Sequence, residues 1–271
     1  MLPYSSGSSY LALMNLTFRK YQGAGNDFVL FYQTVPAITC SQLEIQKICD
    51  RRFGVGSDGL LLVEVLSRDH LRIDFFNPDG SVSFCGNGAR CALRMAYDDG
   101  KINALGSFIG SDGAHTYEVL QDDVEIEMAV AEPPMSIDTD WYVNTGSPHY
   151  VMFREGVDTM DMVQLGRAIR YSERWKDKGV NVNLAEWQSD TLNMRTYERG
   201  VEDETLSCGT GVTAAALCAA GMKRSLTELK VKTRGGSFLV SWSRAGNDTF
   251  TNVKLRGPAK FVFEGNWHFA R

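Results

Sequence analysis

The chain has 271 residues, of which 44% are hydrophobic, and it carries a formal net charge of −5. This length and composition suit a globular protein with a sizeable core. Without a basic stripe or an apolar run long enough to span a bilayer, neither nucleic acid nor a membrane is expected as a partner. The six cysteines and four histidines lack the spacing of a zinc site or a disulfide framework, which favours reduced thiols in the cytoplasm and no bound metal.

Residues 1–13 contain serine and glycine but no positively charged start, so a mobile extension is expected rather than a secretory signal. Ser41 and Glu44 form a capping-box pattern that predicts a helix to about Arg51, ended by Gly54. Apolar and alternating runs predict the strands that surround this helix, over residues 16–21, 28–32, 60–66 and 71–76, with further strands within 102–130.

Residues 131–140, with Pro133-Pro134, are the best candidate for a linker. Beyond them the order of elements repeats, because Asp161 and Gln164 give a second capping-box pattern before a helix to about Arg170. The strands predicted in this second part cover residues 141–143, 150–153, 182–187 and 193–197, and lie near residues 230, 238, 250 and 261.

Several residues recur at nearly one offset along the chain. Asp27 is matched by His149 after 122 residues, and Cys85 by Cys208 after 123 residues. Asn77 and Glu198, Leu71 and Leu192, and Glu64 and Glu186 are spaced in the same way. The sequence therefore predicts two diverged copies of one unit of roughly 120 residues.

The duplication predicts two domains that face each other, residues 15–131 and residues 132–271. The order of elements in each copy predicts an α+β fold in which a mixed sheet wraps around a central buried helix. An active site is expected in the cleft between the two pseudosymmetric domains, with Cys85 on one side and Cys208 on the other.

Both cysteines begin a Cys-Gly-x-Gly stretch that leads into a helix, at residues 85–88 and 208–211. The helix dipole at such a position is expected to lower the pKa of the thiol, and free N–H groups of the turn can hold a carboxylate. One such stretch alone would be interpreted as a structural turn, but two at matched positions favour function. Two opposed thiols could remove a proton from a carbon and return one on the other face, which inverts that carbon.

Three further residues are candidates for this site. Glu198 could hold an ammonium group and Arg199 a carboxylate, although a solvated ion pair is nearly as good an interpretation of these two. His149 lies among turn residues, which makes a role in tuning a thiol plausible beside the more common structural role.

The chain resembles the diaminopimelate epimerase family over about residues 15–265. The resemblance rests on several motifs: Gly25-Asn26-Asp27-Phe28, Asp50-Arg51-Arg52-Phe53-Gly54-Val55-Gly56 with Asp58-Gly59, Asn77-Pro78-Asp79-Gly80-Ser81, Cys85-Gly86-Asn87-Gly88-Ala89-Arg90-Cys91, Gly146-Ser147-Pro148-His149, Asn181-Val182-Asn183, Tyr197-Glu198-Arg199-Gly200 and Cys208-Gly209-Thr210-Gly211.

The resemblance implies a cofactor-independent isomerase that interconverts LL- and meso-diaminopimelate for lysine and cell-wall precursor synthesis. Cys85 and Cys208 would be the acid–base pair, and His149 and Glu198 would modulate their pKa values. The residues implied in binding the amino-acid substrate are Asn26, Asn77, Gly86, Asn87, Asn181, Glu198, Arg199, Gly209 and Thr210. The resemblance also implies a homodimer, and a last strand at about residues 260–271 that returns to the first domain.

The sequence departs from the family pattern at Ser147, where asparagine is common, and at Gly59, where some members have glutamine. The stretch between Asn77 and Cys85 is one residue shorter than usual, and the stretch between Glu198 and Cys208 is one longer. Two alternatives therefore stay open: a related amino-acid racemase or isomerase with another substrate, and a thiol redox or metal-binding protein.

Overall fold

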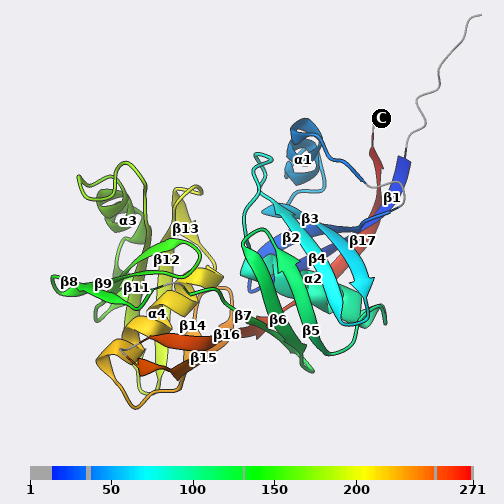
Figure 1. The fold of residues 1–271 in the computed structure, drawn as a ribbon. Helices are drawn as coiled ribbons and strands as arrows, with labels where there is room; N and C mark the ends of the chain where they lie inside the picture. The colour runs from blue at the N-terminus through cyan, green and yellow to red at the C-terminus, as the bar shows by residue number, and fades with distance from the viewer. Residues whose placement is uncertain (1–13, 35–37, 131, 247–248, 270–271) are drawn as a thin grey trace, which may run out of the picture.

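The computed structural model describes residues 14–34, 38–130, 132–246 and 249–269, in two halves that repeat one order of elements (Figure 1). The expected mobile extension at residues 1–13 lies outside the described residues. In the first half, seven strands surround helix α2, and α1 lies on the outside. The elements are β1 (Met14–Gly23), β2 (Asn26–Tyr32), α1 (Gln42–Cys49), β3 (Gly59–Ser67), β4 (His70–Phe76), α2 (Gly86–Asp98), β5 (Leu105–Gly110), β6 (Gly113–Val119) and β7 (Asp123–Glu127).

The second half repeats this order around helix α4. Its elements are β8 (Met135–Ile137), β9 (Asp140–Asn144), β10 (Pro148–Phe153), the 3-10 turn η1 (Val157–Thr159), α3 (Met162–Arg170), β11 (Asn181–Gln188), β12 (Thr191–Glu198), β13 (Asp203–Thr205), α4 (Gly209–Met222), β14 (Glu228–Lys232), β15 (Ser237–Arg244) and β16 (Phe250–Pro258), and the chain continues into β17 (Lys260–Phe269).

The strand pairing shows that the two halves are copies. From β1 to β7 the successive pairs are antiparallel, parallel, antiparallel, parallel, antiparallel and antiparallel. The series β9, β10, β11, β12, β14, β15 and β16 gives the same sequence of pairings. The predicted fold class is confirmed: each half is a mixed sheet wrapped around a buried helix.

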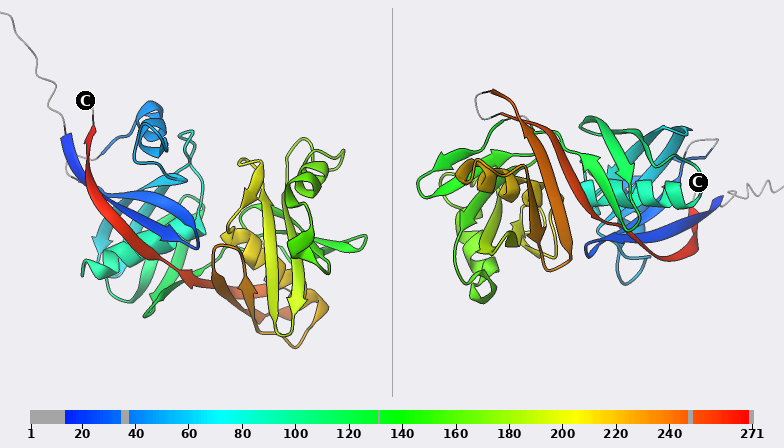
Figure 2. Two further views of the ribbon diagram at one scale, coloured as in Figure 1. Left: turned by 180° about the vertical axis from the view of Figure 1, so that it is seen from behind. Right: turned by 90° about the horizontal axis from the view of Figure 1, so that it is seen from below.

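Two strand pairings join the halves. The equivalent strands β7 and β16 pair antiparallel with each other. Strand β17 leaves the second half and runs antiparallel along β1, as Figure 2 shows from two sides. In the second half, the short strand β8 pairs with β9 in the same way. Strand β17 thus supplies the first half with the strand that β8 supplies to the second.

The central helices are buried because nearly all their side chains are small or apolar. In α4, the side chains from Val212 to Ala220 are fully buried. In α2, burial extends from Gly86 to Ala96 and includes the charged side chain of Arg90. Such helices must lie inside their sheets, and their N-termini are thereby held at a fixed place in the fold.

The outer helices begin where their caps predict. Ser41 and Glu44 form the full capping box at α1. Asp161 accepts the backbone N–H of Gln164 at the start of α3.

Two local predictions were wrong. The helix α1 ends at Cys49, before the predicted Arg51 and Gly54, because the Asp50 carboxylate accepts the N–H groups of the next turn. The predicted linker at 131–140 contains β8 and the start of β9, and Asp140 is buried against the Tyr150 hydroxyl. A strand of three residues is too short to show a period in the sequence.

Candidate active site

Each of the two predicted cysteines is the N-cap residue of a central helix. Cys85 precedes α2, and its sulfur accepts the N–H of Gly88 at 3.5 Å. The Asn26 carbonyl oxygen lies 3.9 Å from the same sulfur. Cys208 precedes α4, and its sulfur lies 3.4 Å from the hydroxyl of Thr210. Both thiols therefore lie beside first-turn N–H groups, which have no partner within a helix.

Polar contacts across the two halves hold the helix N-termini together. Asn87 donates its side-chain amide to Asn26 at 3.2 Å and to the Ser207 hydroxyl at 3.3 Å. The Ser207 hydroxyl in turn donates to the carbonyl of Ala24 at 2.9 Å. A Cβ on Gly209 would lie only 3.3 Å from the Asn87 carbonyl oxygen, so the start of α4 closely approaches the start of α2. Gly86-Asn87 and Gly209-Thr210, which were predicted to bind the substrate, thus lie close together where the two helices begin.

Burial raises the pKa of both thiols, which corrects the prediction that the helix dipole would lower it. The pKa of Cys85 rises to about 11, since burial outweighs the N–H of Gly88. The pKa of Cys208 is also raised by burial and then by the charge of Glu198. A charge on Cys85 raises it further, so the two sulfurs are electrostatically coupled. A helix N-terminus stabilises a thiolate by at most about 2 kcal/mol, which lowers its pKa by roughly 1.5 units. Burial can raise a pKa by several units, so it outweighs the helix.

His149 is linked to Cys208 through the side chain of Thr210. It lies on β10, is fully buried, and its Nε2 is 2.9 Å from the Thr210 hydroxyl. Burial lowers the pKa of His149 to about 3, and the nearby positive charge of Arg199 acts in the same direction. The imidazole is therefore neutral at pH 7.

The end of β12 carries the charged residues that the sequence singled out. Burial raises the pKa of Glu198, against the opposing effect of the Thr205 hydroxyl. Arg199 is exposed, and its guanidinium donates to the carbonyl of Lys178 at 2.8 Å. The Asn181 carbonyl oxygen accepts the backbone N–H of Arg199 at 2.8 Å, which ties β11 to this loop.

Two further asparagines of the prediction lie in the first half, Asn26 as the first residue of β2 and Asn77 in the turn after β4. Asn26 donates to Asp58 at 2.6 Å, which leaves its carbonyl oxygen toward Cys85 and Asn87. Asn77 donates its amide N–H groups within its own turn, to Ser81 and Ser83. The structure therefore places Asn26 beside Cys85, while the amide nitrogen of Asn77 stabilises the turn in which it lies.

Three residues of this region carried no role in the sequence analysis. Arg90 is fully buried and donates to the Asn87 carbonyl oxygen at 2.7 Å, which fixes the direction of that amide. Ser207 precedes Cys208, and Asn183 contacts His149. The sequence did offer a signal for Arg90, because a charged residue within an otherwise apolar helix must find a polar partner when it is buried. The contacts of Ser207 and Asn183 depend on tertiary structure and on strand register.

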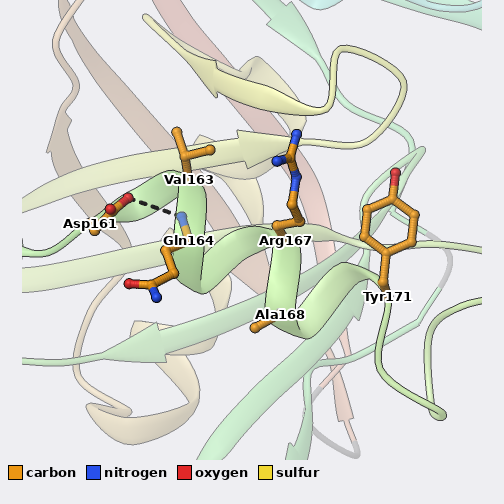
Figure 3. A pocket seen from close by; sticks show the side chains of 6 residues that line it. All are labelled: Asp161, Val163, Gln164, Arg167, Ala168 and Tyr171. Carbon is orange, nitrogen blue, oxygen red and sulfur yellow. Dashed lines mark hydrogen bonds between the residues drawn. The ribbon is translucent and has the colours of Figure 1, made fainter.

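A separate hollow of about 590 Å³ lies along the exposed side of α3 (Figure 3). It is lined by side chains from Asp161 to Tyr171, and no residue predicted for the site lines it. All six cysteines are free thiols. Among the described residues, no three histidine, cysteine or acidic side chains are placed to hold a metal ion. None of the helices within the described ranges is long and apolar enough to cross a membrane.

Comparison with known proteins places the chain in a family. The family model described as diaminopimelate epimerase matches residues 18–139 and again residues 141–262. Diaminopimelate epimerase of Flavobacterium psychrophilum is 40% identical over 250 residues, covering 90% of this chain and 97% of that protein. Diaminopimelate epimerase of Aquifex aeolicus is 36% identical, covering 92% of this chain and 97% of its own length.

Solved structures of lower identity share the fold. A phenazine biosynthesis protein of the PhzF family from Bacillus anthracis superposes with a TM-score of 0.71 at 13% identity, covering 94% of this chain and 99% of that chain. A hydroxyproline epimerase from Agrobacterium vitis gives a TM-score of 0.68 at 12% identity, covering 95% and 93%. With the family model matched in both halves, the chain belongs to the diaminopimelate epimerase family of isomerases.

Proposed function

We propose that Cys85 and Cys208 are the two acid–base groups with which this isomerase interconverts LL- and meso-diaminopimelate. The observation that carries the proposal is their matched position: each cysteine is the N-cap residue of a buried helix, and the two helix starts lie close to each other from opposite halves. A charge on Cys85 also raises the pKa of Cys208, which supports a shared site for the two sulfurs.

The reaction follows from this arrangement. The thiolate of one cysteine removes the α-proton, and the thiol of the other delivers a proton to the opposite face, so the carbon inverts and the two sulfurs exchange protonation states. The raised pKa of a buried thiol makes its thiolate a stronger base toward a weakly acidic C–H bond. The reverse reaction uses the same groups in exchanged roles.

The helix N-termini would stabilise the intermediate. Negative charge moves onto the substrate carboxylate as the proton leaves, and the first-turn N–H groups can donate hydrogen bonds to it. These N–H groups belong to Gly86, Asn87, Gly209 and Thr210. For the remaining polar groups of the substrate, Glu198 would hold the ammonium group and Arg199 the distal carboxylate. Further polar contacts would come from Asn26, Asn77 and Asn181. No cofactor enters any step of this proposal.

The test is proton NMR of LL-diaminopimelate with the reduced protein in deuterated buffer. The wild type should lose the α-proton signal while the meso isomer appears. Cys85→Ala and Cys208→Ala should each lower epimerisation by about 10²–10⁴-fold, the usual contribution of a general acid–base group. Full epimerisation by either variant would exclude the two-thiol mechanism. A wild-type protein that is folded, reduced and inactive here, but active on another amino acid, would favour the alternative racemase.

We also propose that the protein is a cytoplasmic homodimer. The mechanism needs both thiols reduced, which the cytoplasm favours. The surface that supports a dimer is β17, whose apolar residues Phe261, Val262 and Phe263 are about half exposed. Its oligomeric state is tested below.

A further inference from the structure

The side chain of Asn183 contacts Nδ1 of His149, the ring nitrogen that does not face Thr210. Asn183 is on β11 and fully buried. Its amide nitrogen is 3.1 Å from His149 Nδ1 and 3.2 Å from the carbonyl oxygen of Tyr150. Its carbonyl oxygen accepts the hydroxyl of Thr196 at 2.9 Å. All the hydrogen-bonding groups of this amide are thus engaged.

The Tyr150 carbonyl fixes which way the amide points. A carbonyl oxygen only accepts hydrogen bonds, so it requires the NH₂ group of Asn183 on its side. Rotating the amide by half a turn would place two oxygens against each other. With one hydrogen on Tyr150, the second hydrogen of the NH₂ group is directed at His149 Nδ1.

The orientation of Asn183 determines the tautomer of His149. A ring nitrogen that accepts a hydrogen bond carries no proton, so in the neutral ring the proton is on Nε2. That N–H donates to the Thr210 hydroxyl oxygen at 2.9 Å. The hydroxyl has one hydrogen, and the next polar atom beside it is the Cys208 sulfur at 3.4 Å.

One contact opposes a proton on Nε2 of His149, but it is longer than the contact of Asn183 with Nδ1. The amide nitrogen of Asn181 lies 3.5 Å from His149 Nε2, and its orientation is fixed because its oxygen accepts the N–H of Arg199. With the proton on Nε2, this contact is not a hydrogen bond. The other tautomer would instead place an Nδ1 proton against the Asn183 NH₂ group at 3.1 Å, which is the shorter and costlier conflict.

We propose that Asn183 is a positioning residue that holds His149 in the Nε2–H tautomer, so that Thr210 donates its hydroxyl hydrogen to the sulfur of Cys208. The inference rests on the proposed role of Cys208. A hydrogen bond donated to the sulfur favours the thiolate over the thiol, and it does so without placing a charge beside the substrate.

This chain of hydrogen bonds leads to Cys208, and the residues at matched positions in the first half differ. A Cβ on Gly211 would lie 2.6 Å from the Asn183 carbonyl oxygen, so the glycine admits the amide behind the start of α4. In the first half, Asp27 takes the place of His149 and pairs with Lys20 and Arg51. The two thiols therefore receive different hydrogen-bonding partners from matched positions.

Other charges also act on this region and must stay constant in a test. Glu198 and Cys85 raise the pKa of Cys208, and Arg199 lowers that of His149. A variant at Asn183 leaves these three groups in place. Asn183→Asp keeps the shape of the side chain but replaces the donor by a carboxylate, which accepts a hydrogen bond from an Nδ1–H group. It also adds a negative charge and sets an oxygen against the Tyr150 carbonyl, so Thr210→Val, which adds no charge, is the decisive variant for Cys208. Thr196→Val is the matched control, because it removes a buried hydrogen bond at the amide oxygen and leaves the Tyr150 contact.

The first measurement is the tautomer of His149 from long-range proton–nitrogen NMR, assigned with His149→Gln. The wild type and Thr196→Val should show the proton on Nε2, and Asn183→Asp should show it on Nδ1 or on both nitrogens. A wild-type Nδ1–H tautomer would overturn the proposal, and this measurement does not depend on any variant that fails to fold.

The second measurement is the rate of Cys208 alkylation by iodoacetamide against pH, read by peptide mass spectrometry with Cys85 as internal reference. Thr210→Val should slow Cys208 at pH 7.5 by about tenfold, the effect of losing one hydrogen bond to a charged group, while Cys85 is unchanged. Asn183→Asp should slow Cys208 at least as much, because its carboxylate also opposes the thiolate. An unchanged Cys208 rate in Thr210→Val contradicts the proposal. Neither measurement uses substrate, so a failure of Cys208 in the exchange experiment would be recognised separately.

Discussion

At the scale of single residues, burial controls the two thiols more than the helix N-termini do. Both pKa values are raised, so each thiol is largely protonated at neutral pH and its thiolate fraction grows as pH rises. The position of each cysteine at a helix start could be predicted from the sequence. The sign of the pKa change could not, because it depends on how far the folded structure buries each thiol.

The carboxylate of Glu198 is expected to keep both thiols protonated, since its charge raises the pKa of Cys85 and of Cys208. Glu198→Gln removes that charge, so both thiols should ionise at lower pH. At pH 7.5 we expect alkylation of both cysteines to be faster by roughly threefold, as for the loss of one partly screened charge. Alkylation rates against pH, followed by peptide mass spectrometry, provide the check.

Glu202→Gln is the matched control for this prediction. Glu202 lies on the same loop and contacts Arg170 and Tyr197, and the acidic side chain whose charge acts on the thiols is Glu198 instead. Its replacement should leave both alkylation profiles in place. Profiles that shift to higher pH in Glu198→Gln would show that the carboxylate acts on the thiols in some way other than its charge.

At the scale of elements, the sequence predicted those that carry a cap or a period. The capping box at Ser41 and the apolar helices after both cysteines are local signals, and the structure confirms them. The three-residue strands β8 and β13 have no such signal. The contact of Asn183 with His149 depends on the parallel register of β10 with β11, which neither strand encodes alone.

The last strand is an essential part of the first half, although it is farthest from it in sequence. Phe269 on β17 is buried and packs edge-on against Phe31, with ring centroids 5.3 Å apart. Phe269→Ala should lower the free energy of unfolding by about 3–5 kcal/mol, the usual cost of removing a buried aromatic ring. Urea unfolding followed by circular dichroism measures this loss.

A surface phenylalanine serves as the control. Phe53 is 90% exposed, so Phe53→Ala should leave the free energy of unfolding within about 0.5 kcal/mol of the wild type. If Phe269→Ala were equally neutral, β17 would contribute pairing to β1 but no core packing.

At the scale of the whole molecule, the strands that complete the two halves differ in length. Strand β8 completes the second half with three residues, whereas β17 completes the first half with ten. Among the described residues β17 pairs only with β1, so its outer edge offers unpaired backbone groups beside exposed apolar side chains. A long apolar edge strand of this kind promotes association unless something covers it.

A second copy of the chain is the occupant that we propose for this edge. The protein in solution should therefore have twice the 30.1 kDa mass of one chain by light scattering after gel filtration. Val262→Lys places a charge on the half-exposed edge and should shift the mass toward one chain without unfolding it, since lysine is a common guard of edge strands. Met135→Lys changes an exposed apolar residue at the corresponding strand β8 and should leave the dimer intact. A monomeric wild type would exclude the dimer, and a dimeric Val262→Lys variant would move the interface away from β17.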